Sequence, residues 1–438
     1  MSVPTRRRLL AALAVLTVLL LIAFVAVPAL PCGAPGGSVC PASDEAIALV
    51  PDDALAYVHI NADSSTDQYR QASDIAGRIP TLSAQVTGRL LAILPGPHGA
   101  PPDFGRQIGP WFGGQAALAV VPAGGRASDD IELLQVSDAD GARKFARSLA
   151  GAIRTRSYHG VPVSVDRRGL ATAIVDGFLV MGGKAGVHAV IDARSGASAG
   201  GSLADDPSAA AARDALPDQR LADAYLSPDG VARLVANPRG PLSTLDATLD
   251  PAATEGAAFA VVASEDGLEV AVRSKLDPQR ASAQPSFFAA FPGFTPALIG
   301  SLPADSLAYV GMGDPRGALA SLVRQARTSQ PGLAAAVAAL ARRVKQLSGV
   351  SAPLSDSQAF EQATDGLPSP GSMLAYLNLD GLVALGESAG LARDPAYRTF
   401  APEVHRLSAA GDSVDRSQAE LATDFRLIVG AAGSAPSG

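Results

Sequence analysis

The chain has 438 residues, 47% of them hydrophobic and 18% charged, which is typical of a folded protein large enough for two or three domains. Its net charge is −7, and no stripe of Lys and Arg interleaved with aromatic residues follows the N-terminus. These features argue against nucleic-acid binding, because phosphate contacts need a concentrated positive surface.

The N-terminus has the pattern of a membrane anchor. Three arginines close the basic segment 1–8, and Thr17 is the single polar residue of the 19-residue run at 9–27. A spanning helix needs about 20 residues, whereas a cleavable signal core has about 7–15. We predict a cytoplasmic segment at 1–8 and a single transmembrane anchor in the cell membrane at 9–30. The positive-inside rule then makes the rest of the chain extracytoplasmic. A long signal peptide cleaved after Ala29 is the alternative, and it leaves the same bulk of the chain outside the cytosol.

A Pro/Gly-rich linker is predicted at 31–45. It holds the two cysteines of the chain, Cys32 and Cys40, in the sequence CGAPGGSVC. An oxidising compartment favours a disulfide between them, so they are a candidate disulfide. Lipid modification of Cys32 is disfavoured because Pro31 replaces the small residue that processing expects. A metal site is weaker still, because no histidine lies nearby.

A strand followed by a helix recurs after the linker. Each strand is rich in β-branched and aromatic residues, and Asp, Ser or Gly at the junction fits a helix cap or a turn. These units are predicted at 54–60 with a helix after Ser64, and at 131–149, 178–193, 223–235, 307–323 and 374–389. Asp-Gly turns at Asp176-Gly177 and Asp266-Gly267 predict antiparallel hairpins. A further helix is predicted at 332–347.

An internal repeat divides the ordered chain. The sequence VPDDALAYV at 50–58 matches LPADSLAYV at 302–310 in six of nine positions. We predict an α+β fold of two related halves, 46–285 and 286–430, each an antiparallel sheet with flanking helices, and then a flexible tail at 431–438. Four of the seven tyrosines mark one structural position in these strands: Tyr57, Tyr225, Tyr309 and Tyr376. Packing in a core or interface is the favoured role for them, ahead of ligand binding.

Four phenylalanines cluster within eight residues between the two halves: Phe287, Phe288, Phe291 and Phe294. Aromatic side chains usually end in a protein interior, so a hydrophobic seam between the halves is the favoured interpretation. The alternative is an exposed patch that binds a lipid tail, a partner or the membrane surface.

Catalytic motifs are weak in this chain. Ser198 in GASAG lies in a small-residue loop without the preceding strand that a nucleophile elbow needs. The glycines of GMGDPRG at 311–317 are spaced one residue too far for a dinucleotide fingerprint. None of the five histidines shows metal-binding spacing with another. We therefore assign no catalytic, cofactor-binding or metal-binding residue, and expect no cofactor.

Several segments in order carry a resemblance to a known family: LVPDDALAYVHIN, DGFLVMGGKAGVHAVIDA, SLADDP, DAYLSPDGV and SLPADSLAYVGMGDP. Together with the basic N-terminus and apolar run, they resemble the bacterial domain-of-unknown-function family thirty-three fifty-two. The resemblance covers nearly all the chain after the anchor. It implies a single-pass, membrane-anchored extracytoplasmic protein. It carries no catalytic residue over, because that family has no assigned activity.

The function favoured by these observations is a non-enzymatic binding or scaffold role at the cell envelope. The expected partners are the membrane of its own anchor and an envelope protein or hydrophobic ligand. The alternative is an extracytoplasmic hydrolase acting on envelope material, with carboxylates drawn from Asp52-Asp53 and Asp205-Asp206. Such an enzyme needs convergent carboxylates with different pKa values in one cleft. A purely structural role as a spacer stays open beside these two.

Overall fold

The structure is a computed structural model that describes residues 43–96, 100–124, 128–149, 154–196, 201–235, 253–283, 293–313, 352–367, 371–417 and 419–430. The predicted anchor, Cys32, Cys40, Phe287, Phe288, Phe291, Ser198, the helix at 332–347 and the tail lie outside these residues. Among the described residues, no helix has both the length and the apolarity to cross a membrane. The chain divides into two compact units, Met1–Lys275 (unit 1) and Leu276–Gly438 (unit 2).

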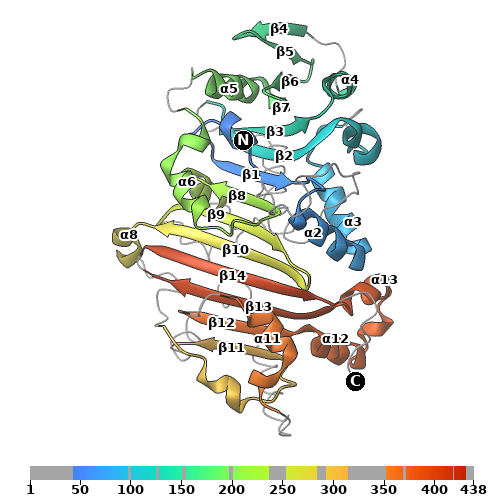
Figure 1. The fold of residues 1–438 in the computed structure, drawn as a ribbon, viewed down its shortest axis with the longest axis vertical. Coiled ribbons are helices and arrows are strands. Elements are labelled where there is room, and N and C mark those ends of the chain that lie inside the picture. The colour runs from blue at the N-terminus through green and yellow to red at the C-terminus, as the bar shows by residue number, and fades with distance from the viewer. Residues whose placement is uncertain are drawn as a thin grey trace, which may run out of the picture. The chain divides into compact units, whose positions relative to one another are not determined.

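Unit 1 is built on an antiparallel sheet with the strand order β10-β9-β8-β1-β2-β3-β7-β6-β5-β4 (Figure 1). Strand β1 therefore lies inside the sheet, whereas β4 ends the order. The strands are β1 (Ala56–Asn61), β2 (Phe112–Pro122), β3 (Ser128–Val136), β4 (Arg154–Tyr158), β5 (Val161–Val165), β6 (Leu170–Val175), β7 (Phe178–Gly183), β8 (Ala222–Leu226), β9 (Thr254–Ala263) and β10 (Gly267–Leu276).

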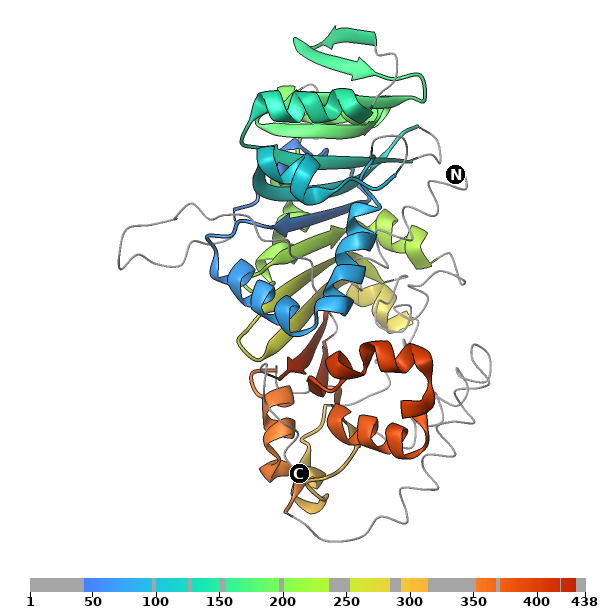
Figure 2. The same cartoon turned by 90° about the vertical axis from the view of Figure 1, so that its right-hand side faces the viewer.

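Helices cover both faces of the unit 1 sheet, because successive strand residues point to opposite faces. On β3, Leu133 packs in the cluster that contains α5 and α6, whereas Leu134 packs in the cluster that contains α4. The two sets of helices can be followed in Figure 2, where α4 is teal and α6 is light green. The helical elements are η1 (Ala46–Leu49), α2 (Asp67–Arg78), α3 (Pro80–Leu91), η3 (Phe104–Ile108), η4 (Gly109–Trp111), α4 (Ala139–Leu149), α5 (Lys184–Ser195), η5 (Leu203–Asp205), α6 (Pro207–Asp214) and α7 (Pro228–Val235).

The Asp-Gly turns form as predicted. Asp176 and Gly177 join β6 to β7 with φ values of 42° and 82°, the left-handed pair that a tight two-residue hairpin requires. Gly267 begins β10, and its carbonyl accepts a hydrogen bond from the Ser264 amide. The predicted strand and helix at 131–149 correspond to β3 and α4, and those at 178–193 to β7 and α5. These elements confirm the α+β class with an antiparallel sheet.

Unit 2 repeats this plan on a smaller scale. Its antiparallel strands run in the order β11-β12-β13-β14, with Tyr309 of β11 opposite Tyr376 of β12. Both tyrosines pack in a cluster with Phe360 and Leu354. The elements are α8 (Pro278–Ala283), η7 (Ala297–Ser301), β11 (Ala308–Met312), η8 (Leu354–Asp356), α11 (Gln358–Thr364), β12 (Met373–Asn378), α12 (Leu379–Ser388), η9 (Leu391–Arg393), α13 (Pro395–Val404), β13 (Leu407–Arg416) and β14 (Glu420–Val429).

Candidate functional site

A histidine and an aspartate face each other across two neighbouring strands of unit 1. His59 of β1 is the register partner of Asp223 of β8, two residues along from the partners Tyr57 and Tyr225. The two-residue period of a strand places all four side chains on one face. His59 is 1% exposed and Asp223 is 3% exposed, and His59 Nδ1 lies 3.4 Å from Asp223 Oδ1. Buried charges need partners of opposite sign, and this pair forms the centre of such a set.

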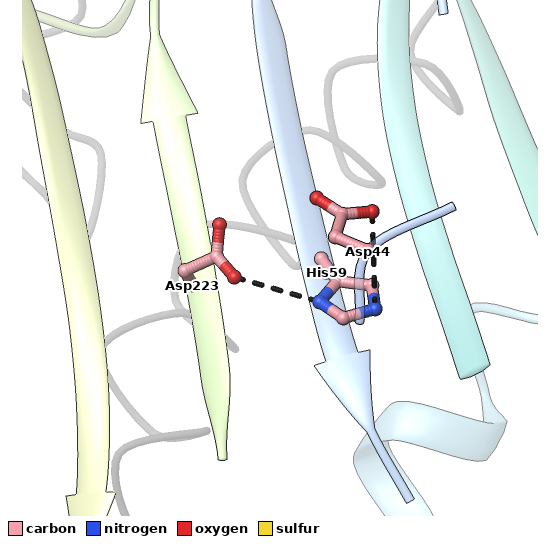
Figure 3. Close-up of side chains that lie close together, drawn as sticks. All are labelled: Asp44, His59 and Asp223. Atoms are coloured by element: carbon pink, nitrogen blue, oxygen red, sulfur yellow. Dashed lines mark ion pairs between the residues drawn. The ribbon is translucent and has the colours of Figure 1, made fainter. Parts of the chain in front are cut away.

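Asp44 reaches the same place from the segment before η1 (Figure 3). Its Oδ1 accepts hydrogen bonds from the Tyr57 hydroxyl at 2.6 Å and the Ile47 amide at 3.2 Å. The same oxygen lies 3.9 Å from His59 Nε2, which makes no hydrogen bond. The aspartate is thus attached both to its own helical turn and to strand β1.

The residues on either side of Asp44 are held by one side chain of β2. The Glu45 amide donates to Gln115 Oε1 at 3.0 Å, and Gln115 Nε2 donates to Ser43 Oγ at 3.1 Å. Gln115 is 4% exposed, so a buried side chain of β2 holds the first described residues of the chain, of which Ser43 and Glu45 are themselves exposed. Three consecutive residues are therefore fixed onto the sheet.

Arg213 connects the two aspartates. Its Nη2 donates to Asp44 Oδ2 at 2.5 Å, and its Nε donates to Asp223 Oδ2 at 3.0 Å. The short helix α6 positions this side chain: Asp206 accepts from the Ala209 amide as N-cap, and Pro207 begins the helix. A guanidinium carries several donors in a fixed plane, so one Arg side chain can bridge two carboxylates.

Arg220 completes the set around Asp223. Its Nε donates to Asp223 Oδ1 at 3.2 Å, and its Nη1 donates to the Pro217 carbonyl at 2.9 Å. Asp44, His59, Arg213, Asp223 and Arg220 thus form a connected group, which we call the charge cluster. All of its bonds lie within unit 1.

The cluster favours the charged form of its members. Burial opposes ionisation of Asp223, but the His59 hydrogen bond and the charge of Arg213 outweigh it and hold the Asp223 pKa far below its usual range. Burial likewise disfavours charged His59, yet the Asp223 hydrogen bond and the Asp44 charge raise the His59 pKa above its usual value. Burial and Asp44 also raise the pKa of Tyr57, so its hydroxyl keeps its proton.

Three members of the cluster have the composition of a metal site but do not fit one. Asp44, His59 and Asp223 each offer a ligand atom within 4.8 Å of the others, the sole such group of three among the described residues. However, Arg213 already donates to both carboxylates. The two ring nitrogens of His59 also face different aspartates, so their lone pairs diverge. A metal ion needs a deprotonated nitrogen and carboxylates with lone pairs to spare, and a guanidinium between the ligands repels a cation.

Unit 2 fills the corresponding position without charges. Gly311 and Leu374 are register partners two residues along from Tyr309 and Tyr376, the place that His59 and Asp223 hold in unit 1. A Cβ on Gly311 would collide with the Tyr309 hydroxyl and would lie 2.8 Å from a ring carbon of Phe294, so these two aromatic side chains occupy the space above this glycine. Phe294 packs against the core of unit 2. An aromatic contact thus stands where unit 1 has ion pairs.

The residues singled out from the sequence fall into three groups. The four tyrosines are buried, at 0% for Tyr57, 3% for Tyr225, 7% for Tyr309 and 0% for Tyr376, and they lie opposite one another in two pairs. Of the phenylalanines, Phe294 is half-buried in unit 2, and the other three lie outside the described residues. The two cysteines lie outside them as well.

The acidic pairs act in turns. The loops that carry them meet at a bridge between Pro51 and Ser202. Asp206 caps α6, and Asp205 Oδ2 accepts from the Ser202 hydroxyl at 2.8 Å.

Sequence reasoning missed the charge cluster. The available signal was a charged side chain two residues from a repeat tyrosine, in the order Tyr57-x-His59 and Asp223-x-Tyr225. The second repeat has Gly311 and Leu374 at these places, so a comparison of the repeats isolates His59 and Asp223. No local sequence pattern identifies Asp44 or Arg213, because they meet the other members of the charge cluster only in the folded chain.

Replacing Arg213 with Met should strongly destabilise the protein. The change leaves two buried carboxylates without their shared partner, and breaking a buried ion pair from one side costs about 3–5 kcal/mol. Arg194→Met is the matched control, because Arg194 pairs with Asp176 at the surface, where a pair contributes about 0–1 kcal/mol. Denaturant unfolding measures both free energies. Equal losses in the two variants would contradict a structural role for the cluster.

The free energy of unfolding should fall as pH rises above the ordinary His pKa of 6.5. His59 has a raised pKa in the folded state, so its contribution is complete below 6.5 and is lost as pH passes the folded pKa. His59→Gln should flatten this dependence in denaturant titrations across neutral pH. His188→Gln should not, because burial and Lys184 lower the His188 pKa and give the opposite slope. An unchanged slope in His59→Gln would refute the assignment.

Comparisons with known proteins give a family but no activity. No curated protein matches the chain. Among solved structures, crystal form I of TP0453 is 10% identical over 54% of this chain and 80% of that one, with a TM-score of 0.30. Crystal form III of TP0453 is 11% identical over 55% of this chain and 80% of that one, again with a TM-score of 0.30. The family model described as "Protein of unknown function (DUF3352)" matches residues 9–353, and the chain therefore belongs to that family, as the sequence resemblance predicted.

Proposed function

We propose that the protein is a membrane-anchored extracytoplasmic scaffold that presents its two units at the cell envelope without catalysing a reaction. The observation that carries this proposal is the fastening of Asp44 into the interior of unit 1 by Tyr57, Arg213 and the Ile47 amide. Asp44 follows the predicted anchor by only 14 positions. A short tether thus enters the fold at a point fixed by buried ion pairs.

The family match supports the anchor proposal because the matched segment includes the apolar run. It starts at residue 9, the first residue of the apolar run, and continues through unit 1. The three arginines before that run orient it with the folded units outside the cytosol.

Duplication of one folding unit supports a scaffold role. Pro51 bridges Ser202 in unit 1, and Pro303 bridges Pro353 in unit 2. A 3₁₀ turn and a helix precede the second tyrosine strand in both units: η5 and α6 before β8, and η8 and α11 before β12. We infer that the two units descend from one repeat. A second copy of this plan adds surface area to a scaffold. The charged residues that could mark an active site, His59 and Asp223, are not repeated in unit 2.

The chemistry of the charge cluster also favours a structural role. A nucleophilic or acid–base site needs a histidine or carboxylate that can reach substrate. His59 and Asp223 are almost fully buried, and their polar contacts are with one another and with other members of the cluster. The cluster therefore holds segments together.

The hydrolase alternative retains one supporting observation. Burial and the Asp52 charge raise the pKa of Asp53, as a general acid requires. Its neighbours across the Pro51–Ser202 bridge are already engaged, Asp206 as a helix cap and Asp205 with the Ser202 hydroxyl. The scaffold proposal explains more of the described structure.

Membrane extraction tests the proposal on the full chain. We expect the protein to stay in the membrane pellet in alkaline carbonate and to be cleaved by protease added outside intact cells. Leu19→Arg with Leu20→Arg should release it from the pellet, because each Arg at a helix centre costs about 2.5–3.5 kcal/mol in insertion. The matched control is Arg393→Leu with Arg398→Leu, which leaves the anchor intact. Wild-type chain in the soluble cytosolic fraction would contradict the proposal. An intact mass lacking residues 1–29 would indicate cleavage and overturn the anchor.

A further inference from the structure

One end of unit 1 gathers cationic side chains. Residues 143–194 contain nine Lys or Arg and three Asp or Glu, a net charge of +6 in a chain whose total is −7. The rest of the chain therefore carries −13. Within the described residues, this stretch forms most of α4 together with β4, β5, β6, β7 and α5. These strands occupy the end of the sheet order that β4 closes (Figure 1).

The three acidic residues of this stretch already have partners. Asp166 pairs with Arg168, Asp176 pairs with Arg194, and Asp192 accepts from the Tyr158 hydroxyl. Arg143 pairs with Asp140. Six exposed cations remain for which the described part of the chain shows no ion pair, and we call them the cationic end: Lys144, Arg147, Arg154, Arg156, Arg167 and Lys184.

Protection of the edge strand explains only part of this set. Charged residues on an outermost strand discourage pairing with other chains, and Arg154 and Arg156 stand on β4. Lys144 and Arg147 belong to α4, and Lys184 begins α5, away from the edge strand. Since α4 and α5 cover opposite faces of the sheet, the positive charge continues around this end from one face to the other.

We propose that the cationic end contacts the anionic phospholipid headgroups of the membrane that holds the anchor, an inference that rests on the proposed function. Guanidinium and ammonium groups bind phosphate oxygens through charge-assisted hydrogen bonds. An anionic bilayer attracts clusters of Lys and Arg and repels the remainder of the chain, whose net charge is −13. The charge distribution therefore selects which part of unit 1 faces the lipid.

The tether is long enough for this contact. The 13 residues at 31–43 span at most about 47 Å when extended. Strand β4 is six strand-to-strand steps from β1, about 29 Å at the usual spacing of about 4.8 Å. Because Asp44 is fixed beside β1, the cationic end lies within reach of the bilayer that the tether leaves. Attachment to the same membrane also raises the effective concentration of headgroups around it.

Energy transfer in reconstituted vesicles tests the contact. The full chain with Cys32→Ser and Cys40→Ser carries a donor fluorophore on Ser157→Cys of β4, and the vesicles carry an acceptor lipid. We expect at least twofold higher transfer in vesicles containing phosphatidylglycerol than in phosphatidylcholine vesicles. Salt at about 1 M should abolish the difference, because the screening length falls to about 3 Å.

Charge-reversal variants distinguish a specific effect of the cationic end from a general effect of net charge. Arg154→Glu with Arg156→Glu should reduce transfer to the level of neutral vesicles. Arg393→Glu with Arg398→Glu makes the same change of net charge in unit 2 and should leave transfer unchanged. Arg154→Gln with Arg156→Gln is a milder version that should give an intermediate loss. Thermal unfolding of each labelled variant establishes that the fold is kept.

Two results would overturn the proposal. Equal transfer in neutral and anionic vesicles excludes headgroup recognition. Protection of the label by soluble polyphosphate, without a response to anionic vesicles, assigns the surface to a soluble polyanion. Alkaline carbonate extraction of the same vesicles reports the anchor separately. Chain that is extracted therefore refutes the anchor, whereas chain that is retained without composition-dependent transfer refutes only the lipid contact.

Discussion

The guanidinium of Arg213 between Asp44 and Asp223 is the interaction on which the start of this fold depends. The Asp223 side chain is buried and the Asp44 side chain is largely buried, and an unpaired charge is strongly unfavourable in such a place. One planar cation satisfies both, and it does so only if the segment before η1, strand β8 and helix α6 are all in place. His59 and Tyr57 then add strand β1 to the same set of contacts. Four separate pieces of the chain are thereby coupled to one side chain.

The second unit shows that the sheet itself does not require these charges. Gly311 and Leu374 occupy the equivalent register, and the side chains of Tyr309 and Phe294 fill the space above the glycine. Replacing buried ion pairs by packed apolar residues is often neutral or stabilising. Directional hydrogen bonds, by contrast, accept one arrangement of donors and acceptors. We therefore infer that the ion pairs of unit 1 fix the position of the segment before η1, where the chain enters the unit.

Local patterns predicted the elements of this structure well. Asp-Gly turns specify the hairpin of β6 and β7 and the hairpin of β9 and β10, because their hydrogen bonds close within a short stretch of chain. The repeat tyrosines were found for a related reason: Tyr57 and Tyr309 recur inside similar sequence. These signals depend on neighbours in the chain, so a sequence alone reveals them.

The charge cluster and the cationic end depend on neighbours in space. Asp44 stands in a Pro/Gly-rich stretch that predicts a linker, and only Tyr57, Arg213 and His59 explain its burial. The cations at 143–194 are spread over two helices, strand β4 and the turn between β5 and β6, so no basic run marks them. The sequence shows no stripe of Lys and Arg interleaved with aromatic residues after the N-terminus, and it is the sheet that brings dispersed charges to one end.

Hydrogen exchange at the Glu45 and Ile47 amides tests the central claim most directly. The Glu45 amide donates to Gln115 of β2, a bond that exists only while the entering segment is fastened to the sheet, whereas the Ile47 amide is held through Asp44, whose other oxygen binds Arg213. We expect these amides to exchange as slowly as the interior amides of β1, because the segment opens only when the surrounding sheet opens. Exchange at the rate of an unstructured chain, with β1 still protected, would show that the segment is not fastened and would contradict the account.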